Sequence, residues 1–149
     1  MRKTDLYKEL LEEIRAVTDG ENDSIATMAN VSALIHEKFG HWWTGFYRVI
    51  GEELVLGPFQ GPVACTRIKR GRGVCGTAWK ESRTVIVPNV HEFPGHIACS
   101  SFSNSEIVIP VYDQNQNITG VLDIDSRDFN TFDATDAKWL EEICKLITI

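Results

Sequence analysis

A cysteine in a long connection is the first feature of this 149-residue chain that indicates chemistry. Cys99 lies between two β-branched runs, in a stretch (residues 87–101) that also holds His91 and His96. Loops much longer than about 12 residues are uncommon inside compact domains and are often lids or binding loops. A thiolate in such a loop is a candidate nucleophile. The alternative is a loop pinned by its own apolar side chains, with Cys99 merely buried.

The other cysteines leave several interpretations open. Cys65 and Cys75 are ten positions apart and lie in or beside loop segments, whereas Cys144 falls on the inward stripe of the last helix and is expected to be a core thiol. A zinc site and a Cys–His hydrolase pair are both conceivable. The residues available for them are Cys65, Cys75, Cys99, His91 and His96. No cysteine pair has the spacing of a zinc finger or ribbon, so we expect no metal.

Three carboxylates form a second candidate group. Asp123 and Asp125 have the same parity on a strand whose other face carries Leu122 and Ile124. They therefore point either to solvent or into a polar pocket. Glu106 opens the neighbouring strand and can approach them across a hairpin. Like charges held close together raise the pKa of at least one carboxyl, which can then donate a proton near neutral pH.

Aromatic side chains accompany these groups. Strand alternation places Trp43, Gly45 and Tyr47 on one face, with Trp42 and Phe46 on the other. A thiol, a proton donor and an anionic cage for an ammonium group, beside Trp43 and Tyr47, would suit a small zwitterion with a sulfur-containing or apolar tail.

The elements that must position these residues follow from hydrophobic periodicity. Two helices are expected first, one closed by Gly20 and one capped by Asp23 or Ser24 and stopped by Gly40. We predict strands over 42–49, 54–56, 63–68, 84–87, 106–111 and 118–125, a loop over 57–62, a short helix over 77–80, and a last helix capped by Asp133. Pro110 requires a sheet edge or a bulge. The order predicts an α+β fold, an antiparallel sheet with helices on one face and long loops on the other.

Composition restricts the class of protein. The net charge of −6 without a basic cluster argues against nucleic acid or anionic lipid as partner. The N-terminus has no apolar signal region, and no run of about 18 apolar residues indicates a membrane span. We therefore expect a single domain over residues 1–149 in the cytoplasm, where thiols remain reduced.

At these residues the sequence resembles the free methionine-(R)-sulfoxide reductase family, which is built on a single GAF domain. The matching segments are WTGFY (43–47), LVLGPFQG (54–61), ACTRI (64–68), GRGVCG (71–76), FPGHIAC (93–99), NSEIV (104–108) and GVLDIDS (120–126). They occur in order and cover about residues 42–126. A generic GAF domain shares the Gly-Val-Leu-Asp strand but not the cysteines in these contexts.

The resemblance implies that Cys99 is the nucleophile. Its thiolate would attack the sulfur of free methionine-(R)-sulfoxide, release methionine and become a sulfenic acid. A second cysteine would then form a disulfide that thioredoxin or a similar dithiol reduces. Cys65 is the preferred resolving residue and Cys75 the rival. The chain departs from the family in having Ser100 directly after Cys99, where Asp is usual. Because a negative charge is then missing beside Cys99, its thiolate should form slightly more easily.

The resemblance also gives roles to the other candidates. Glu106, Asp123 and Asp125 would hold the substrate ammonium and protonate the departing oxygen. Trp43 and Tyr47 would receive the S-methyl group. No cofactor is implied, and family analogy suggests a homodimer. The competing interpretation is a non-catalytic GAF module that binds a small ligand or senses redox state through its thiols.

Overall fold

The computed structural model describes residues 1–96 and 102–149. Two helices, α1 (Lys3–Thr18) and α2 (Ser24–Phe39), precede the first strands. The remaining elements are β1 (Trp43–Ile50), β2 (Glu53–Gln60), β3 (Arg67–Lys69), α3 (Gly73–Glu81), β4 (Val85–Val87), the 3-10 turn η1 (Val90–Glu92), β5 (Ser105–Tyr112), β6 (Ile118–Ser126) and α4 (Ala134–Cys144). The strands form one antiparallel six-stranded sheet in the order β3-β2-β1-β6-β5-β4.

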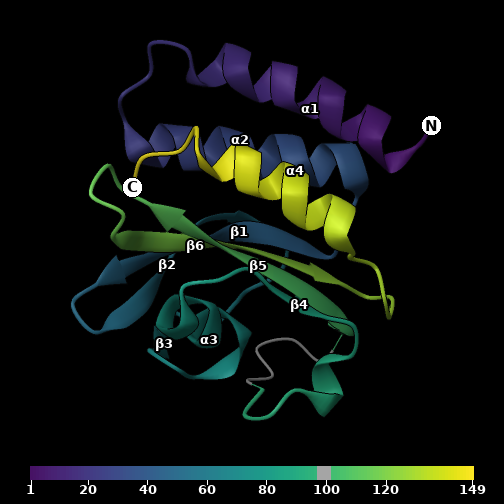
Figure 1. Ribbon diagram of the computed structural model, residues 1–149, viewed down its shortest axis with the longest axis vertical. Helices are drawn as coiled ribbons and strands as arrows, with labels where there is room; N and C mark the ends of the chain where they lie inside the picture. Colours follow the sequence, from purple (N-terminus) through teal and green to yellow (C-terminus); the bar gives the residue numbers. More distant parts are fainter. Residues whose placement is uncertain (97–101) are drawn as a thin grey trace.

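Helices α1, α2 and α4 lie together on one face of the sheet (Figure 1). The end signals predicted from sequence are present. Asp23 accepts a hydrogen bond from the amide of Ala26 at 2.9 Å, and Gly40 ends α2 in the left-handed conformation at φ +65°. The core between helices and sheet is built from alternate strand residues and the inward helix stripes. Its fully buried members include Leu10, Ile14, Met28, Ile35, Phe46, Ile107, Leu122, Leu140 and Ile143.

The other face of the sheet is covered by α3 and by the loops around it (Figure 1). The expected layering is thus correct for three helices, but α3 belongs to the loop side. It also begins at Gly73, earlier than expected, so that Cys75 lies on a helix. The second core is formed by Trp43, Tyr47, Leu54, Ile68, Val74, Cys75, Ala78, Trp79, Val85, Val87, Val90, Val108 and Val121.

The prediction was wrong in the region that follows β1. β2 continues to Gln60, into the predicted loop over 57–62. The register of its pairing with β1 shifts between Gly45 and Tyr47, and this irregularity accommodates Pro58. β3 takes the place of the predicted strand over 63–68. Just before it, the Leu56 amide of β2 still donates to the Thr66 carbonyl oxygen at 2.9 Å. Further back, side chains of β1 replace the ladder: Tyr47 donates to the carbonyl oxygen of Cys65, and Trp43 to that of Pro62.

Pro110 meets its predicted condition in an unexpected way. β5 is an interior strand, but β4 pairs only with residues up to Val108. At Pro110, which lies opposite Val121 of β6, the other side of β5 therefore has no strand partner. A residue without an amide hydrogen is tolerated there.

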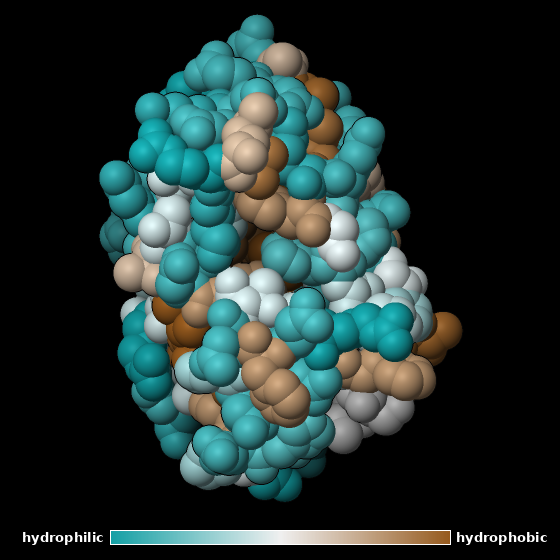
Figure 2. All heavy atoms as spheres, turned by 90° about the vertical axis from the view of Figure 1, so that its right-hand side faces the viewer, coloured by the Kyte–Doolittle hydropathy of each residue, from teal (hydrophilic) through white to brown (hydrophobic). Residues whose placement is uncertain are grey.

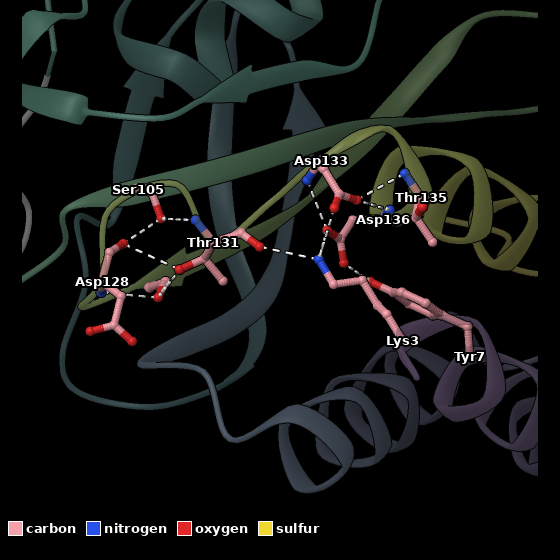
Figure 3. A network of polar contacts seen from close by, with 9 residues as sticks. Lys3, Tyr7, Ser105, Asp128, Thr131, Asp133, Thr135 and Asp136 are labelled. Atoms are coloured by element: carbon pink, nitrogen blue, oxygen red, sulfur yellow. Dashed lines mark hydrogen bonds and ion pairs between the residues drawn. The ribbon is translucent and has the colours of Figure 1, made fainter. Parts of the chain in front are cut away.

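A polar network joins the first helix to the ends of β5 and β6 (Figure 3). The Lys3 ammonium donates to Asp136 at 2.6 Å and to the carbonyl oxygen of Thr131 at 3.2 Å. Tyr7 donates to the other oxygen of Asp136 at 2.5 Å. The Thr131 amide donates to the hydroxyl of Ser105, the residue before Glu106, at 3.4 Å. The network fixes the strand ends next to the acidic residues.

Asp133 caps α4 as predicted. Its carboxylate accepts from the amides of Thr135 at 2.9 Å and Asp136 at 3.3 Å, and Asp136 accepts from the Asp133 amide at 2.9 Å (Figure 3). This reciprocal pair is a capping box. In the part of the chain described here, no helix has the length and apolar character needed to cross a membrane.

Candidate active site

A pocket lies between the sheet and the loops on the α3 side. Strands β1, β5 and β6 provide its floor, and α3 with the segment before β3 provides its walls. The residues that line it include Trp42, Trp43, Tyr47, Val63, Ala64, Arg72, Cys75, His96, Ser103, Glu106, Asp123 and Asp125. All three predicted carboxylates and both predicted aromatic residues are in this set.

Strand register explains why these side chains meet. Asp125 of β6 lies opposite Trp43 of β1 on one side and opposite Glu106 of β5 on the other. Asp123, two residues earlier on the same strand, faces the same side of the sheet. The inward face of β6 thus carries its two carboxylates to the centre of the pocket. The solvent-facing alternative for Asp123 and Asp125 is excluded by this arrangement.

Burial changes the acid–base behaviour of this acidic cluster, which comprises Glu106, Asp123 and Asp125. Glu106 and Asp123 are each only 6% exposed. Burial raises the pKa of Glu106 well above its usual range, and the charges of Asp123 and Asp125 raise it further. Burial likewise raises the pKa of Asp125, with the charge of Asp123 adding to it. A buried carboxyl of this kind can hold a proton near neutral pH.

Cys75 of α3 faces the same cluster. Its sulfur lies within 4.8 Å of carboxylate oxygens of both Glu106 and Asp123, and these oxygens lie within the same distance of each other. Burial, followed by the charge of Asp123, raises the pKa of the Cys75 thiol well above its usual range. The thiol is therefore protonated at neutral pH and a weak nucleophile in the substrate-free pocket.

The aromatic wall is fixed by stacking and by hydrogen bonds. Trp43 stacks on Tyr47 with ring centroids 6.0 Å apart and on Phe59 at 5.1 Å. The Trp43 indole donates to the Pro62 carbonyl oxygen at 3.1 Å. Position 45 requires glycine, because a Cβ there would lie 2.3 Å from the Phe59 Cβ. The wall is therefore rigid and apolar, suited to a small apolar group.

Cys65 lies beside the pocket, next to the lining residue Ala64. The Tyr47 hydroxyl donates to the Cys65 carbonyl oxygen at 2.8 Å, which holds this segment against β1. Cys65 is disulfide-bonded and half-buried, whereas Cys75 and Cys144 are buried free thiols. Cys144, as expected, belongs to the helical core and takes no part in the pocket.

The predicted nucleophile, Cys99, lies outside the residues that the structure describes, as does Ser100. The preceding part of this connection is anchored as its apolar residues suggested. Val90 is fully buried, and its amide donates to the carbonyl oxygen of Asn104 at 3.0 Å. His91 contacts the Asn104 side chain at 2.8 Å, so it ties the connection together.

Several pocket residues were not found from the sequence, and three of them carry polar or aromatic side chains. Ser103 donates to Asp125 at 3.2 Å. Arg72 lines the pocket at the start of α3. Trp42 was placed on the opposite face by alternation, yet it lines the pocket because it precedes β1, where alternation does not apply. The one signal for them in the sequence is that they lie close to the predicted site residues.

The rim of the site carries exposed apolar and aromatic side chains. Val63 is 87% exposed and Phe102 54% exposed. The Arg127 guanidinium lies 4.9 Å from the Trp42 ring centroid and 5.2 Å from that of Phe102. On the face shown in Figure 2, hydrophobic side chains border a hollow near the middle, and other hydrophobic groups are scattered over a largely hydrophilic surface.

The fold and the pocket place the chain in a known class. The family model of the GAF domain matches residues 5–149, and the chain belongs to that family. Two relatives, at 48% and 40% identity, are named free methionine-R-sulfoxide reductase. Within the GAF-domain proteins, the chain therefore belongs to the free methionine-R-sulfoxide reductase family. The GAF-like fold predicted from sequence is confirmed.

Three similar proteins illustrate the relationship. GAF domain-containing protein A of Dictyostelium discoideum is 58% identical, covering 97% of this chain and 92% of that protein. The free methionine-R-sulfoxide reductase of Escherichia coli is 48% identical, covering 96% and 87%. A structure of the free methionine-R-sulfoxide reductase from Neisseria meningitidis in complex with its substrate has a TM-score of 0.95 at 50% identity, covering 98% and 88%.

Proposed function

We propose that this protein reduces free L-methionine-(R)-sulfoxide to L-methionine by thiol chemistry, and that one GAF domain over residues 1–149 carries the activity. One observation carries the proposal. The pocket combines a rigid aromatic wall, Trp43 and Tyr47, with a buried acidic cluster on β5 and β6. The relatives named for this reaction share the fold over nearly the whole chain.

The pocket matches the parts of this substrate. The wall of Trp43 and Tyr47 accepts the S-methyl group, and the acidic cluster takes the ammonium group and supplies a proton. Arg72, which lines the same pocket, offers a cation for the substrate carboxylate. A peptide-bound methionine has neither a free ammonium nor a free carboxylate at these positions, so the pocket favours the free amino acid.

The reaction proceeds in three steps. The Cys99 thiolate attacks the sulfoxide sulfur, and the oxygen takes a proton from the acidic cluster and passes to the thiol sulfur. Methionine leaves with the electron pair, and Cys99 becomes a sulfenic acid. A second thiol attacks this sulfur, forms a disulfide and releases water. An external dithiol then reduces the disulfide and becomes oxidised itself.

We assign the resolving role to Cys65. It is half-buried at the pocket wall and disulfide-bonded, which supports a redox role. Cys75 is a buried free thiol whose pKa is raised by burial, which disfavours its thiolate. Cys75 is therefore the less suitable resolving residue.

The reductant we propose is thioredoxin or a similar dithiol protein. We propose that the reaction takes place in the cytoplasm and that the enzyme acts as a homodimer. Val63, two residues before Cys65, is 87% exposed and gives such a partner an apolar contact beside the disulfide. The supply of reduced dithiols in that compartment matches the need for repeated reduction of Cys65.

The experiment is consumption of separated R and S epimers of free L-methionine sulfoxide, with dithiothreitol as reductant. Wild type is expected to consume only the R epimer and Cys99→Ser neither. Cys65→Ser is expected to retain one turnover per chain but to lose most of its steady-state rate with thioredoxin. Cys144→Ser, a core thiol, is the matched control and should keep the wild-type rate.

Two outcomes would contradict the proposal. If wild type consumes neither epimer, the chain is not this enzyme, and the binding or redox-sensing GAF module becomes the better interpretation. If Cys75→Ser, and not Cys65→Ser, loses steady-state turnover with thioredoxin, the resolving role belongs to Cys75.

A further inference from the structure

We propose that Cys75, Glu106 and Asp123 form a binding site for a thiophilic divalent cation such as Zn²⁺, and that the bound ion blocks the pocket. The cysteine–histidine zinc site considered from sequence involves other residues. The three ligands of the new site come from three different elements, α3, β5 and β6. Only the folded sheet brings them together.

The geometry fits a metal ion. One ligand atom from each residue lies within 4.8 Å of the other two. Zinc–sulfur bonds of about 2.3 Å and zinc–oxygen bonds of about 2.0–2.2 Å span nearly this separation, so small side-chain rotations complete the set. All three residues are buried. All three are on a helix or a strand, which hold ligands more rigidly than loops do.

An unpartnered atom provides an independent reason. The Oδ1 atom of Asp123 is buried and has no hydrogen-bond partner among the described residues, although the residue is only 6% exposed. Buried carboxylate oxygens are normally hydrogen-bonded or coordinated, and one without a partner requires an explanation. Asp123 lines the pocket, and a cation there would coordinate this oxygen.

The charges also favour a cation. Within the described part of the chain, neither Glu106 nor Asp123 belongs to any ion pair. Arg72 lines the same pocket without pairing with them. Two carboxylates and a thiolate carry three negative charges, which a divalent cation reduces to one. Binding displaces the protons that these groups hold in the metal-free pocket.

The donor set selects the kind of ion. A sulfur ligand with two carboxylates suits Zn²⁺, Co²⁺ or a softer ion, whereas Mg²⁺ and Ca²⁺ require oxygen donors. Three protein ligands leave a tetrahedral ion one open position. That position faces the pocket. Given the proposed function, the ion occupies the carboxylates that the substrate ammonium needs, so it competes with the sulfoxide.

The direct test is Co²⁺ binding followed by absorption spectroscopy, with Zn²⁺ displacement. A Cys65→Ser, Cys99→Ser background removes the other pocket-side thiols. In it, we expect a near-ultraviolet thiolate-to-cobalt band with one ion bound per chain. Adding Cys75→Ser should abolish the band and weaken Zn²⁺ binding at least about 100-fold, since even outer-shell substitutions cost 10–100-fold. Adding Cys144→Ser instead should leave both unchanged.

Carboxylate variants guard against loss of folding. Glu106→Gln and Asp123→Asn keep side-chain size, and circular dichroism verifies their fold. Each should weaken Zn²⁺ binding at least tenfold, and Asp125→Asn, outside the ligand set, much less. A cobalt band that persists without Cys75, or Asp125→Asn equal in effect to Asp123→Asn, would overturn the site.

The effect on activity is measured separately. Reduced wild-type protein, freed of added thiols that would chelate the ion, is mixed with methionine sulfoxide for a single turnover. Zn²⁺ should raise the sulfoxide concentration needed for half-maximal reaction without lowering the maximum. Inhibition that excess sulfoxide cannot reverse would overturn the competitive blockade. Zn²⁺ binding in a chain that reduces no sulfoxide would leave the site standing and refute the proposed function instead.

Discussion

At the scale of single residues, the pocket depends on carboxyls that the fold keeps away from water. Glu106 is 6% exposed, and burial raises its pKa well above the usual range. In bulk water a carboxylate near pKa 4 would be a poor proton donor at pH 7. The strand pairing with Asp125 places a second acid beside it and strengthens the effect.

The matching prediction concerns Glu106→Gln. The amide preserves size but cannot transfer a proton, and loss of a general acid typically costs about 10²–10⁴-fold in rate. We expect kcat for methionine sulfoxide to fall by at least about 100-fold, measured by steady-state kinetics. The control is Glu92→Gln, an exposed glutamate of η1, which should keep the wild-type rate. A kcat within threefold of wild type would rule out an essential role for Glu106.

At the scale of elements, the aromatic wall depends on the close approach of β1 and β2. A Cβ at Gly45 would lie 2.3 Å from the Phe59 Cβ and 2.7 Å from Trp43 Cη2. The first contact is with the base of a side chain on a paired strand, which cannot rotate away. The strands must separate to relieve it, and the wall must move with them.

We therefore predict that Gly45→Ala lowers the free energy of unfolding by about 1–3 kcal/mol, the usual cost of overpacking. It should also raise KM for the sulfoxide, because Trp43 shifts. Urea unfolding and steady-state kinetics measure the two effects. Gly57→Ala of β2 provides the comparison, since its Cβ would meet the Phe46 carbonyl oxygen at 3.1 Å and the Arg48 side chain at 3.6 Å, but no ring. Equal effects on KM for both variants would contradict this account of the wall.

At the scale of the whole molecule, the helical layer contains a histidine held neutral. His41 stacks on Phe39 with ring centroids 5.5 Å apart and contacts Phe132 at 5.0 Å. Its pKa is lowered to about 4, mainly by burial and to a smaller extent by the positive charge of Lys3, while the charge of Asp136 opposes the shift. Lys3 and Asp136 belong to the network that joins α1 to α4 (Figure 3).

This histidine makes stability depend on pH. Between pH about 4 and the unfolded value near 6.5 the unfolded chain binds more protons at this residue, so its contribution to stability increases with pH. The contribution is complete above pH 6.5 and lost as the pH falls to 4, to a maximum of about 3 kcal/mol. In His41→Phe, the free energy of unfolding should change less with pH across this window than in wild type, as measured by urea unfolding at several pH values. The same slope in both proteins would contradict the assignment.

The sequence by itself determined much of this protein, because local signals agreed with the final fold. Helix stripes, the caps at Asp23, Gly40 and Asp133, and the parity of Trp43 with Tyr47 all act within one segment. Such signals are readable without knowledge of distant neighbours. The resemblance then supplied the family, and the relatives confirmed it.

Other features were decided only by tertiary structure. The extension of β2 through Pro58, and the shortening of the strand that follows it to β3, depend on which neighbouring strand is long enough to pair. The places of Ser103 and Arg72 in the pocket, and the meeting of Cys75 with Glu106 and Asp123, depend on how α3, β5 and β6 pack. Contacts between segments far apart in sequence leave no local pattern, because their energy is gained only when the sheet closes around them.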